Sequence, residues 1–213
     1  MLLINIMANI YMCSMNLRGK WAELPDNCKR INVTSAQSKK SINRITFSPM
    51  SPFNNPIDKF KDFYCFENYW QSGKRFEGIT DINKQLKWWK DQTKGRRKYP
   101  LGKGKKVLHA IFPGIEKPLS YIPSRKLVYI PEYYNLIKDS DVLKDIINQY
   151  KKGTNFAVYD FDGPRGENKE PISCLVTLDF LKEKVNYERD PFGHGYIVAA
   201  AIMGYKPDDY SKN

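Results

Sequence analysis

The sequence predicts an α+β fold: a single compact domain, rich in helices, with a small β-sheet. Three observations lead to this class. The 213-residue chain is long enough for one buried core and too short for two large domains. Its 41% hydrophobic and 14% aromatic residues are more than a disordered chain carries. Segments with the alternation of strands and segments with helical spacing both occur, and the helical ones are in the majority.

Residues 1–28 are expected to be a leader, and residues 29–213 the domain. The chain begins with the largely apolar run MLLINIMANIYMCSMNL. This run lacks the basic start and the small-residue cleavage site of a secretory signal. It is also shorter than the roughly 20 residues that a membrane-spanning helix needs. We therefore expect no membrane span, with an interfacial helix as the alternative.

Strands and a loop are expected next. KRINVT (29–34) and RITFS (44–48) show β-branched alternation and are separated by a polar, turn-like stretch. The run PMSPFNNPIDKFKD (49–62) holds three prolines and two adjacent asparagines, which predicts an irregular loop.

Three helices are expected in the middle of the chain. The first is FENYWQSGKRF (66–76), and the second is TDINKQLKWWKDQ (80–92), where Thr80 or Asp81 can cap the start. The third is DSDVLKDIINQYKKG (139–153), with a polar cap at its start, an apolar stripe and a final glycine.

The C-terminal part is expected to hold one strand and two helices. NFAVYDF (155–161) has strong strand character and is closed by the turn sequence DGPRG. CLVTLDFLKEKV (174–185) returns to helical spacing. The last helix is expected from Asp190, with proline at its first position, to Gly204.

Charge predicts a phosphorylated or polyanionic partner. The 35 basic and 23 acidic residues give a net charge of +12. Residues 84–106 hold eight lysines and two arginines against one acid, with Trp88, Trp89 and Tyr99 among them. Phosphate attraction combined with base stacking is typical of DNA or RNA binding, and a solvated lysine-rich loop is the alternative. The candidate nucleic-acid contacts are Lys94, Arg96, Arg97, Lys98, Lys103, Lys105 and Lys106.

Cysteine usage favours a reducing compartment. The four cysteines are far apart and include no Cys-x-x-Cys, which argues against a zinc cage or a disulfide framework. We therefore expect a cytoplasmic protein. The excess of lysine over arginine and of isoleucine and asparagine over alanine suits a low-GC bacterium, a phage or a large DNA virus. A viral protein would act in the host cytoplasm or nucleus.

The first candidate site is the helix that contains FENYWQSGK. Glu67, Gln71 and Lys74 are spaced to place a carboxylate, an amide and an ammonium along one helical face. Trp70 lies beside that stripe, where it could stack on a base or a ribose. The alternative is an amphipathic helix whose polar stripe is solvated and salt-bridged.

The second candidate site is the strand end YDFDGPRG. Asp160 and Asp162 are two residues apart, so they project from one face of an extended strand, next to Arg165. Such a pair can bind a ribose diol, hold a metal, or pair with the arginine and cap the turn. We expect no metal site and no cofactor, since His109 and His194 are the only histidines.

The third candidate site is DPFGHGYIVAAA. The first turn of a helix presents free N–H groups to an anion, and Gly193 and Gly195 remove side chains from that turn. Either they admit a phosphate or they allow a close helix crossing. The positive end of the helix dipole should push His194 between them towards its neutral form. Phe192 precedes the turn.

The order of these parts resembles the NADAR (NAD and ADP-ribose associated) domain family. That family has a helix motif E-H-x-x-Q-x-x-K and a late aromatic-glycine segment. Glu67, Gln71 and Lys74 match the helix motif, and Phe192 with Gly193 matches the aromatic-glycine pair. The resemblance spans roughly residues 45–204. The sequence departs from the family at Asn68 and Trp70, where histidine and phenylalanine are usual, and the YDFDGPRG strand end has no evident counterpart.

The resemblance implies an N-glycosidase. Members of the family hydrolyse the bond between an ADP-ribose or ribose phosphate group and a nucleobase or amine. By that resemblance Glu67 would stabilise positive charge on the ribose or orient water. Asp160 and Asp162, which come from the strand-end pattern and not from the resemblance, are the further catalytic candidates. Lys74 would bind phosphate or assist the leaving group, and residues 193–195 would receive phosphate. The alternatives are a non-catalytic nucleic-acid-binding protein and a structural protein with no small-molecule site.

Overall fold

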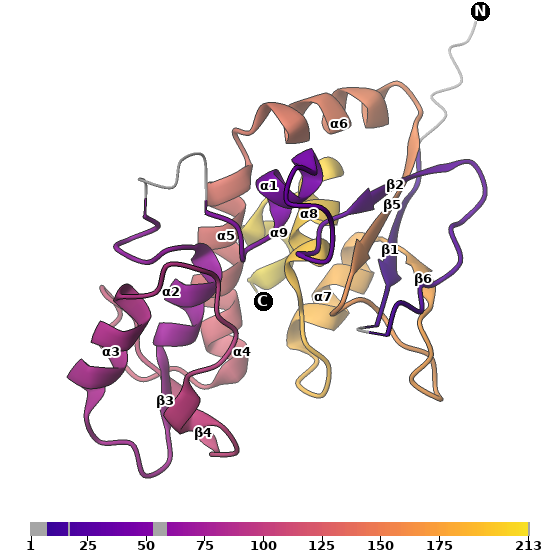
Figure 1. Ribbon diagram of the computed structural model, residues 1–213. Coiled ribbons are helices and arrows are strands. Elements are labelled where there is room, and N and C mark those ends of the chain that lie inside the picture. Colours follow the sequence, from indigo (N-terminus) through magenta and orange to yellow (C-terminus); the bar gives the residue numbers. More distant parts are fainter. Residues whose placement is uncertain (1–7, 17, 53–58, 213) are drawn as a thin grey trace, which may run out of the picture.

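In the computed structural model, helices pack against a small mixed β-sheet in one α+β domain, which is the predicted class (Figure 1). The structure describes residues 8–16, 18–52 and 59–212. Residues 1–7 of the expected leader and 53–58 of the expected loop lie outside this description. Within the described part, no helix combines the length and apolarity needed to cross a membrane.

A four-stranded sheet of order β2-β5-β1-β6 forms one side of the domain (Figure 1). Its centre is β5 (Asn155–Asp160), which runs parallel to β2 (Cys28–Asn32) and to β1 (Ile10–Ser14). The edge strand β6 (Ser173–Leu175) pairs antiparallel with β1. The expected strands at 29–34 and 155–161 are confirmed.

Strand β1 corrects the expected boundary at residue 28. Its residues Ile10, Met12 and Cys13 are almost wholly buried, because the strand lies between β5 and β6. Central strands of parallel sheets are buried on both faces and therefore have near-continuous apolar sequences. That property explains the apolar run in the expected leader, and the domain extends back at least to Ala8.

Helix α8 (His194–Ile202) packs against β5 and β1. All nine of its residues are buried, as expected for a helix that is hydrophobic on every side. It begins at His194 and not at Asp190 as predicted, with Gly193 as its N-cap. The backbone N–H of Gly195 in its first turn donates to Asp160 Oδ2 at 2.9 Å, so the cap comes from a distant strand.

Helix α2 (Phe66–Ser72) is shorter than predicted. Beyond Gly73 the chain forms β3 (Lys74–Phe76), which pairs with β4 (Val107–Ala110) in a separate two-stranded sheet. The buried guanidinium of Arg75 donates to the carbonyls of Ser72 and Gly73 at 2.9 Å each and so satisfies the helix end. Lys74 is therefore on a strand and is not part of a helical stripe.

Helix α1 (Ile42–Phe47) replaces the strand that RITFS predicted. Ser41 caps it by accepting from the backbone N–H of Arg44. Thr46 and Phe47 form its buried side. Tertiary packing of these two residues outweighs the β-propensity of the segment.

Three other helices follow the sequence more closely. Helices α3 (Ile82–Lys90) and α6 (Asp141–Lys151) begin at the side-chain caps Asp81 and Ser140, as predicted. Helix α7 (Leu178–Asn186) starts later than expected, because residues 173–175 pair with β1.

A helical column that the sequence did not predict separates the sheet from the α2 and α3 lobe (Figure 1). It consists of α4 (Tyr121–Ser124), a π-helical turn (Arg125–Tyr129) and α5 (Ile130–Ile137). Pro131 cannot donate to the carbonyl four residues earlier, and its ring crowds that carbonyl, which accounts for the wider turn. The remaining short elements are a 3-10 turn at Pro100–Gly102 and α9 (Pro207–Ser211).

Candidate functional site

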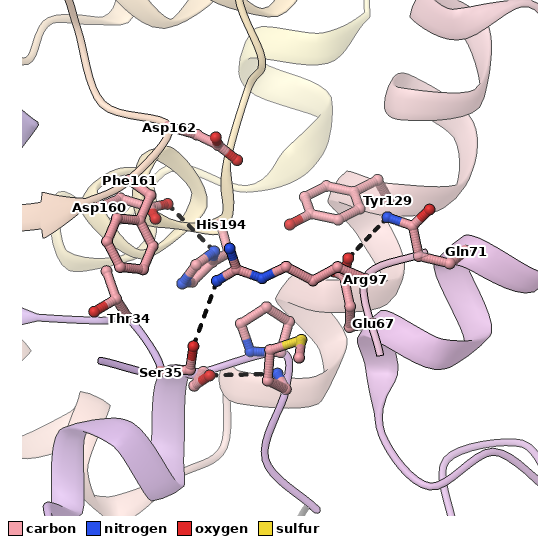
Figure 2. Close-up of a pocket in the computed structure, with 13 residues that line it drawn as sticks. Thr34, Ser35, Glu67, Gln71, Arg97, Tyr129, Asp160, Phe161, Asp162 and His194 are labelled. Carbon is pink, nitrogen blue, oxygen red and sulfur yellow. Dashed lines mark hydrogen bonds and ion pairs between the residues drawn. The ribbon is translucent and has the colours of Figure 1, made fainter. Parts of the chain in front are cut away.

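A cavity of ≈ 210 Å³ opens where the parallel strands β2 and β5 end (Figure 2). Ligands of open parallel sheets bind outside the carboxyl ends of the strands. The sheet side and α8 contribute Thr34, Asp160, Phe161, Asp162 and His194. The opposite side contributes Glu67 and Gln71 from α2 and Tyr129 from the π-helical turn. It also contributes Arg97 from the lysine- and arginine-rich residues 84–106, which we call the basic segment. We call this space the carboxylate cavity.

The carboxylate cavity unites the first two predicted sites. Glu67 and Gln71 lie on one side and Asp160 and Asp162 on the other (Figure 2). Among the described residues, no three His, Cys, Asp or Glu side chains are arranged to hold a metal ion.

Two of the carboxyl groups have raised pKa values. Burial raises the pKa of Glu67, while its hydrogen bond from Gln71 and the charges of Lys74 and Arg97 oppose the rise. Burial, together with the charge of nearby Asp160, raises the pKa of Asp162 to about 6. Carboxyl groups perturbed in this way are typical of sites that transfer protons near neutral pH.

Gln71 fixes the position of Glu67. Its Nε2 donates to Glu67 Oε1 at 2.8 Å, one helical turn away. The predicted i, i+4 relationship between these two residues is confirmed, and the amide orients the carboxylate within the cavity (Figure 2).

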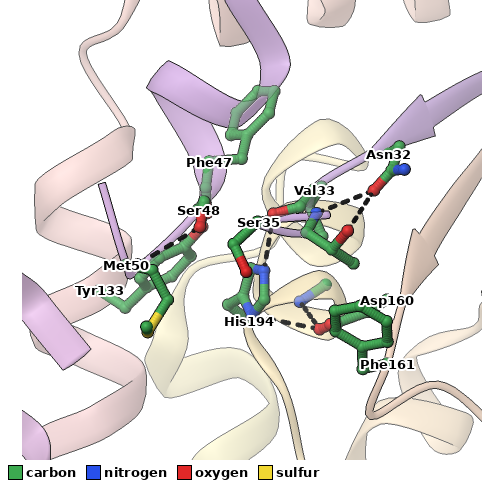
Figure 3. Close-up of polar contacts among 12 residues, drawn as sticks. Asn32, Val33, Ser35, Phe47, Ser48, Met50, Tyr133, Asp160, Phe161 and His194 are labelled. Atoms are coloured by element: carbon green, nitrogen blue, oxygen red, sulfur yellow. Dashed lines mark hydrogen bonds and ion pairs between the residues drawn. The ribbon is translucent and has the colours of Figure 1, made fainter. Parts of the chain in front are cut away.

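His194 is held between two acceptors (Figure 3). Its Nδ1 lies 3.2 Å from Asp160 Oδ2, and its Nε2 lies 2.9 Å from the backbone carbonyl of Val33. Both ring nitrogens are thus engaged by protein groups, and these contacts fix the imidazole at the wall of the cavity.

The expected anion turn at residues 193–195 is already filled by protein. A Cβ on Gly193 would lie 2.6 Å from Asp160 Oδ2 and 2.7 Å from Asp162 Cβ. One on Gly195 would lie 2.8 Å from Asp160 Cβ, and the Gly195 N–H already has Asp160 as its acceptor. The missing side chains of the two glycines thus leave room for Asp160 and Asp162 at the end of β5, and not for a phosphate or a crossing helix. Of this motif only His194 lines the carboxylate cavity, since Phe192 is buried against Tyr196.

Arg97 places a positive charge inside the carboxylate cavity. Its guanidinium lies over the ring of Phe161, 5.4 Å from the centroid, and Nη2 is 3.4 Å from Ser35 Oγ. Figure 2 shows it between the two carboxylate-bearing sides. The sequence predicted this residue as a nucleic-acid contact, and the structure also makes it part of the cavity wall.

Asn68 holds the basic segment at the edge of the carboxylate cavity through two hydrogen bonds. This fully buried side chain donates to the carbonyl of Lys94 at 3.1 Å and accepts from the N–H of Arg96 at 2.7 Å. The two bonds fix the backbone immediately before Arg97. The residue that departs from the family motif thus positions a cavity-lining cation.

Sequence reasoning missed Tyr129. It is buried at the cavity wall, and its hydroxyl points into the cavity (Figure 2). Burial and the three neighbouring carboxylates raise its pKa well above the ordinary value, so the hydroxyl stays protonated. The one signal for this residue was Pro131, which distorts the helix that carries it.

Besides Phe192, Gly193 and Gly195, three more predicted site residues lie outside the carboxylate cavity. Lys74 lines two adjacent cavities, and burial lowers its pKa. Trp70 is a core residue, stacked on Phe112 with a centroid distance of 5.5 Å, so it does not face the carboxylates as expected. Arg165 forms no ion pair with Asp160 or Asp162 among the described contacts. Its Nη2 donates instead to the carbonyls of Met15 and Phe161.

The basic segment is exposed, but two of its three aromatic residues are not free to stack on bases. All seven candidate contacts are exposed: Lys94, Arg96, Arg97, Lys98, Lys103, Lys105 and Lys106. Trp89 and Tyr99 are buried, and Trp88 packs against both of them. The basic side chains can therefore attract phosphates, whereas burial removes Trp89 and Tyr99 from base stacking; Trp88 is half-buried, and its stacking on a base stays a prediction.

Comparison with known protein families, with curated proteins and with solved structures gave no match to this chain.

Proposed function

We propose that the protein is an N-glycosidase that hydrolyses the bond between a ribose phosphate or ADP-ribose group and a nucleobase or amine. The observation that supports this most directly is the pairing of two carboxyl groups of raised pKa, Glu67 and Asp162, at one cavity. Glycoside hydrolysis uses two carboxyl groups in this way, one as acid and one as base or charge stabiliser. The NADAR-like motif at Glu67 and Gln71 agrees with this assignment.

The proposed reaction breaks the C1′–N bond, and the bonding electrons leave with nitrogen. Asp162, partly protonated near its pKa of about 6, donates a proton to the leaving group. Glu67 stabilises the positive charge that develops on the ribose ring. Water then attacks C1′ and releases a proton that restores the acid, so that one water is consumed per bond cleaved.

The remaining cavity residues fit supporting roles. Arg97 attracts an anionic group of the substrate, and Gln71 holds Glu67 in place. Tyr129 and Phe161 offer aromatic walls for a sugar or base. Asp160 is engaged by His194 and Gly195, so we assign it to positioning and not to proton transfer.

A non-catalytic nucleic-acid-binding protein is the second candidate. The observation that favours it is the exposure of the basic segment, which does not depend on the cavity. In that case the carboxylates would only shape the fold, and their replacement would leave binding unchanged.

Product analysis separates the two candidates. The purified protein is incubated with ADP-ribosylated nucleobases, ADP-ribosylated nucleic acid and ribosylamine phosphates, and the products are identified by mass spectrometry. The proposal expects a free base or amine from at least one substrate, and loss of that product with Glu67→Gln but not with the exposed control Glu116→Gln. Absence of cleavage of all three substrates, with nucleic acid still bound, would favour the second candidate.

A further inference from the structure

Three cavities meet at Arg97. Besides the carboxylate cavity, this side chain lines one cavity of ≈ 350 Å³ and another of ≈ 500 Å³. We call these the lysine cavity and the arginine cavity. The carboxylate cavity shares Gln71 with the lysine cavity, and it shares Phe161 and Asp162 with the arginine cavity. The carboxylates therefore lie in the middle of a series of adjoining depressions.

The wall of the lysine cavity is basic. Of the described residues that line it, five are cationic and none is acidic: Lys74, Arg97, Lys98, Lys103 and Lys105. Lys74 is half-buried and forms no ion pair within the described part of the chain. Its Nζ lies 5.9 Å from the centroid of the Trp70 ring, and the charges of Glu67 and Asp162 act on it from the adjoining carboxylate cavity. Several like charges around one depression attract an anion with more than one negative charge.

The arginine cavity lies on the other side of Phe161 and Asp162. Arg18, Arg97 and Arg165 line it, with Asp162 as the one acidic residue of its wall in the described chain. Two backbone carbonyls hold the Arg165 guanidinium in place, 2.8 Å and 3.0 Å from Nη2. A fixed guanidinium with free N–H groups is well suited to phosphate.

We propose that the substrate is a single-stranded nucleic acid laid across Arg97. The reacting nucleoside occupies the carboxylate cavity, and the backbone phosphates on its two sides lie in the lysine and arginine cavities. ADP-ribose or ribose phosphate carries phosphate on one side of its ribose only, whereas each internal nucleotide of a strand has phosphate on both. A nucleoside in a duplex would first have to leave its stack to enter the cavity, which disfavours duplex.

The inference rests on the proposed function for the reaction, but binding tests it separately. Binding of a fluorescent single-stranded oligonucleotide is measured by fluorescence anisotropy at salt concentrations from about 50 to about 300 mM. Over roughly this range the release of counterions from the phosphates determines how the affinity depends on salt. The variants are Lys98→Glu/Lys103→Glu/Lys105→Glu on one side and Arg18→Glu on the other. A control of equal charge change uses the exposed residues Lys138, Lys151 and Lys182, each replaced by glutamate.

Both sides should contribute to the salt dependence. Each phosphate contact on a single strand adds about 0.7 to the log-log slope, so the triple variant should lower the slope by about 2 and Arg18→Glu by about 0.7. The control should change it much less. Binding should survive Glu67→Gln, and a matched duplex should bind more weakly.

Three outcomes would overturn the inference. The first is an equal effect of the control, which would indicate general attraction to a basic protein. The second is a lower slope in the lysine-side triple variant but not in Arg18→Glu, together with complete displacement of the oligonucleotide by ADP-ribose. That result would indicate a free dinucleotide-type ligand in place of a strand. The third is release of the base from an ADP-ribosylated nucleobase with strand binding unaffected by either set, which would leave the proposed function intact. Strand binding at both sides without any base release would instead contradict the proposed function and leave the inference standing.

Discussion

His194 Nδ1 lies 3.2 Å from Asp160 Oδ2, and this contact joins the start of α8 to the end of β5 (Figure 3). The same oxygen accepts the Gly195 N–H at 2.9 Å, and His194 Nε2 reaches the carbonyl of Val33 after β2. One carboxylate and one imidazole thus fix two strand ends and a helix start. These elements form the sheet side of the carboxylate cavity.

Asp160→Ala should destabilise the protein by about 3 kcal/mol or more, because it leaves the Gly195 N–H and the His194 ring without their buried acceptor. Urea denaturation followed by circular dichroism measures this loss. Replacement of the exposed Asp179 by alanine is the control. A loss below about 1 kcal/mol would mean that the contact does not hold the strand end.

Gly193→Ala should cost about 1 to 3 kcal/mol through overpacking, since the new Cβ would lie 2.6 Å from Asp160 Oδ2. The backbone at Gly193 is ordinary for any residue, with φ −78°, so strain at φ is not the cause. Thermal denaturation of this variant and of Gly193→Ala/Asp160→Ala checks the mechanism. The cost of the alanine should shrink in the Asp160→Ala background, and equal costs in both backgrounds would contradict it.

Ionisation of Asp162 should lower the free energy of unfolding as pH rises. Its pKa is raised from 3.8 to about 6, so the folded protein binds this proton more tightly than the unfolded chain does. The resulting stability is complete below pH 4 and is lost as pH rises to about 6, by about 2 to 3 kcal/mol. Asp162→Asn should remove this part of the pH dependence. Denaturation curves at pH 4, 5, 6 and 7 measure it, and the prediction fails if both proteins show the same profile.

Asn68 should control the placement of Arg97. Asn68→Ala leaves the Lys94 carbonyl and the Arg96 N–H without their partner, and it should cost about 1 to 3 kcal/mol. Asn68→Asp keeps the acceptor for Arg96 but sets a buried carboxylate oxygen against the Lys94 carbonyl, and it should cost at least as much. Both variants should raise KM more than they lower kcat, because the loop that holds Arg97 is loosened. An unchanged KM in Asn68→Ala would separate this side chain from the site.

The sequence predicted those helices and strands whose capping residues and hydrophobic pattern are close together along the chain. Ser140 before α6 and the apolar run of β5 are examples. The start of α8 was missed because its cap, Asp160, is 35 residues away in sequence. The strand expected at 44–48 became α1 because tertiary packing outweighed propensity.

The candidate site was predictable only where its residues follow a local sequence pattern. Glu67 and Gln71 were found from helical spacing, and Asp160 and Asp162 from strand alternation. Their meeting in one cavity depends on the position of α2 across the cavity from the end of the sheet, which spacing does not encode. Tyr129 was missed because its hydroxyl reaches the cavity from a helix that carries no motif.

The pH dependence of cleavage should report the acid. If Asp162 protonates the leaving group, kcat should fall as pH rises above about 6, where this carboxyl ionises. Asp162→Asn should lower kcat and abolish that limb of the profile. A rate that rises through pH 6 and 7 in the original protein would contradict the assignment of Asp162 as acid.

Steady-state kinetics of Glu67→Gln tests the central claim most directly. The amide keeps the size of the side chain and removes the negative charge that should stabilise the ribosyl transition state. We predict a loss in kcat of about 100-fold or more with KM little changed, and a melting temperature equal to or above that of the original protein, because burial raises the pKa of Glu67. Turnover within about threefold of the original on an authenticated substrate would contradict the claim that Glu67 is the catalytic carboxylate.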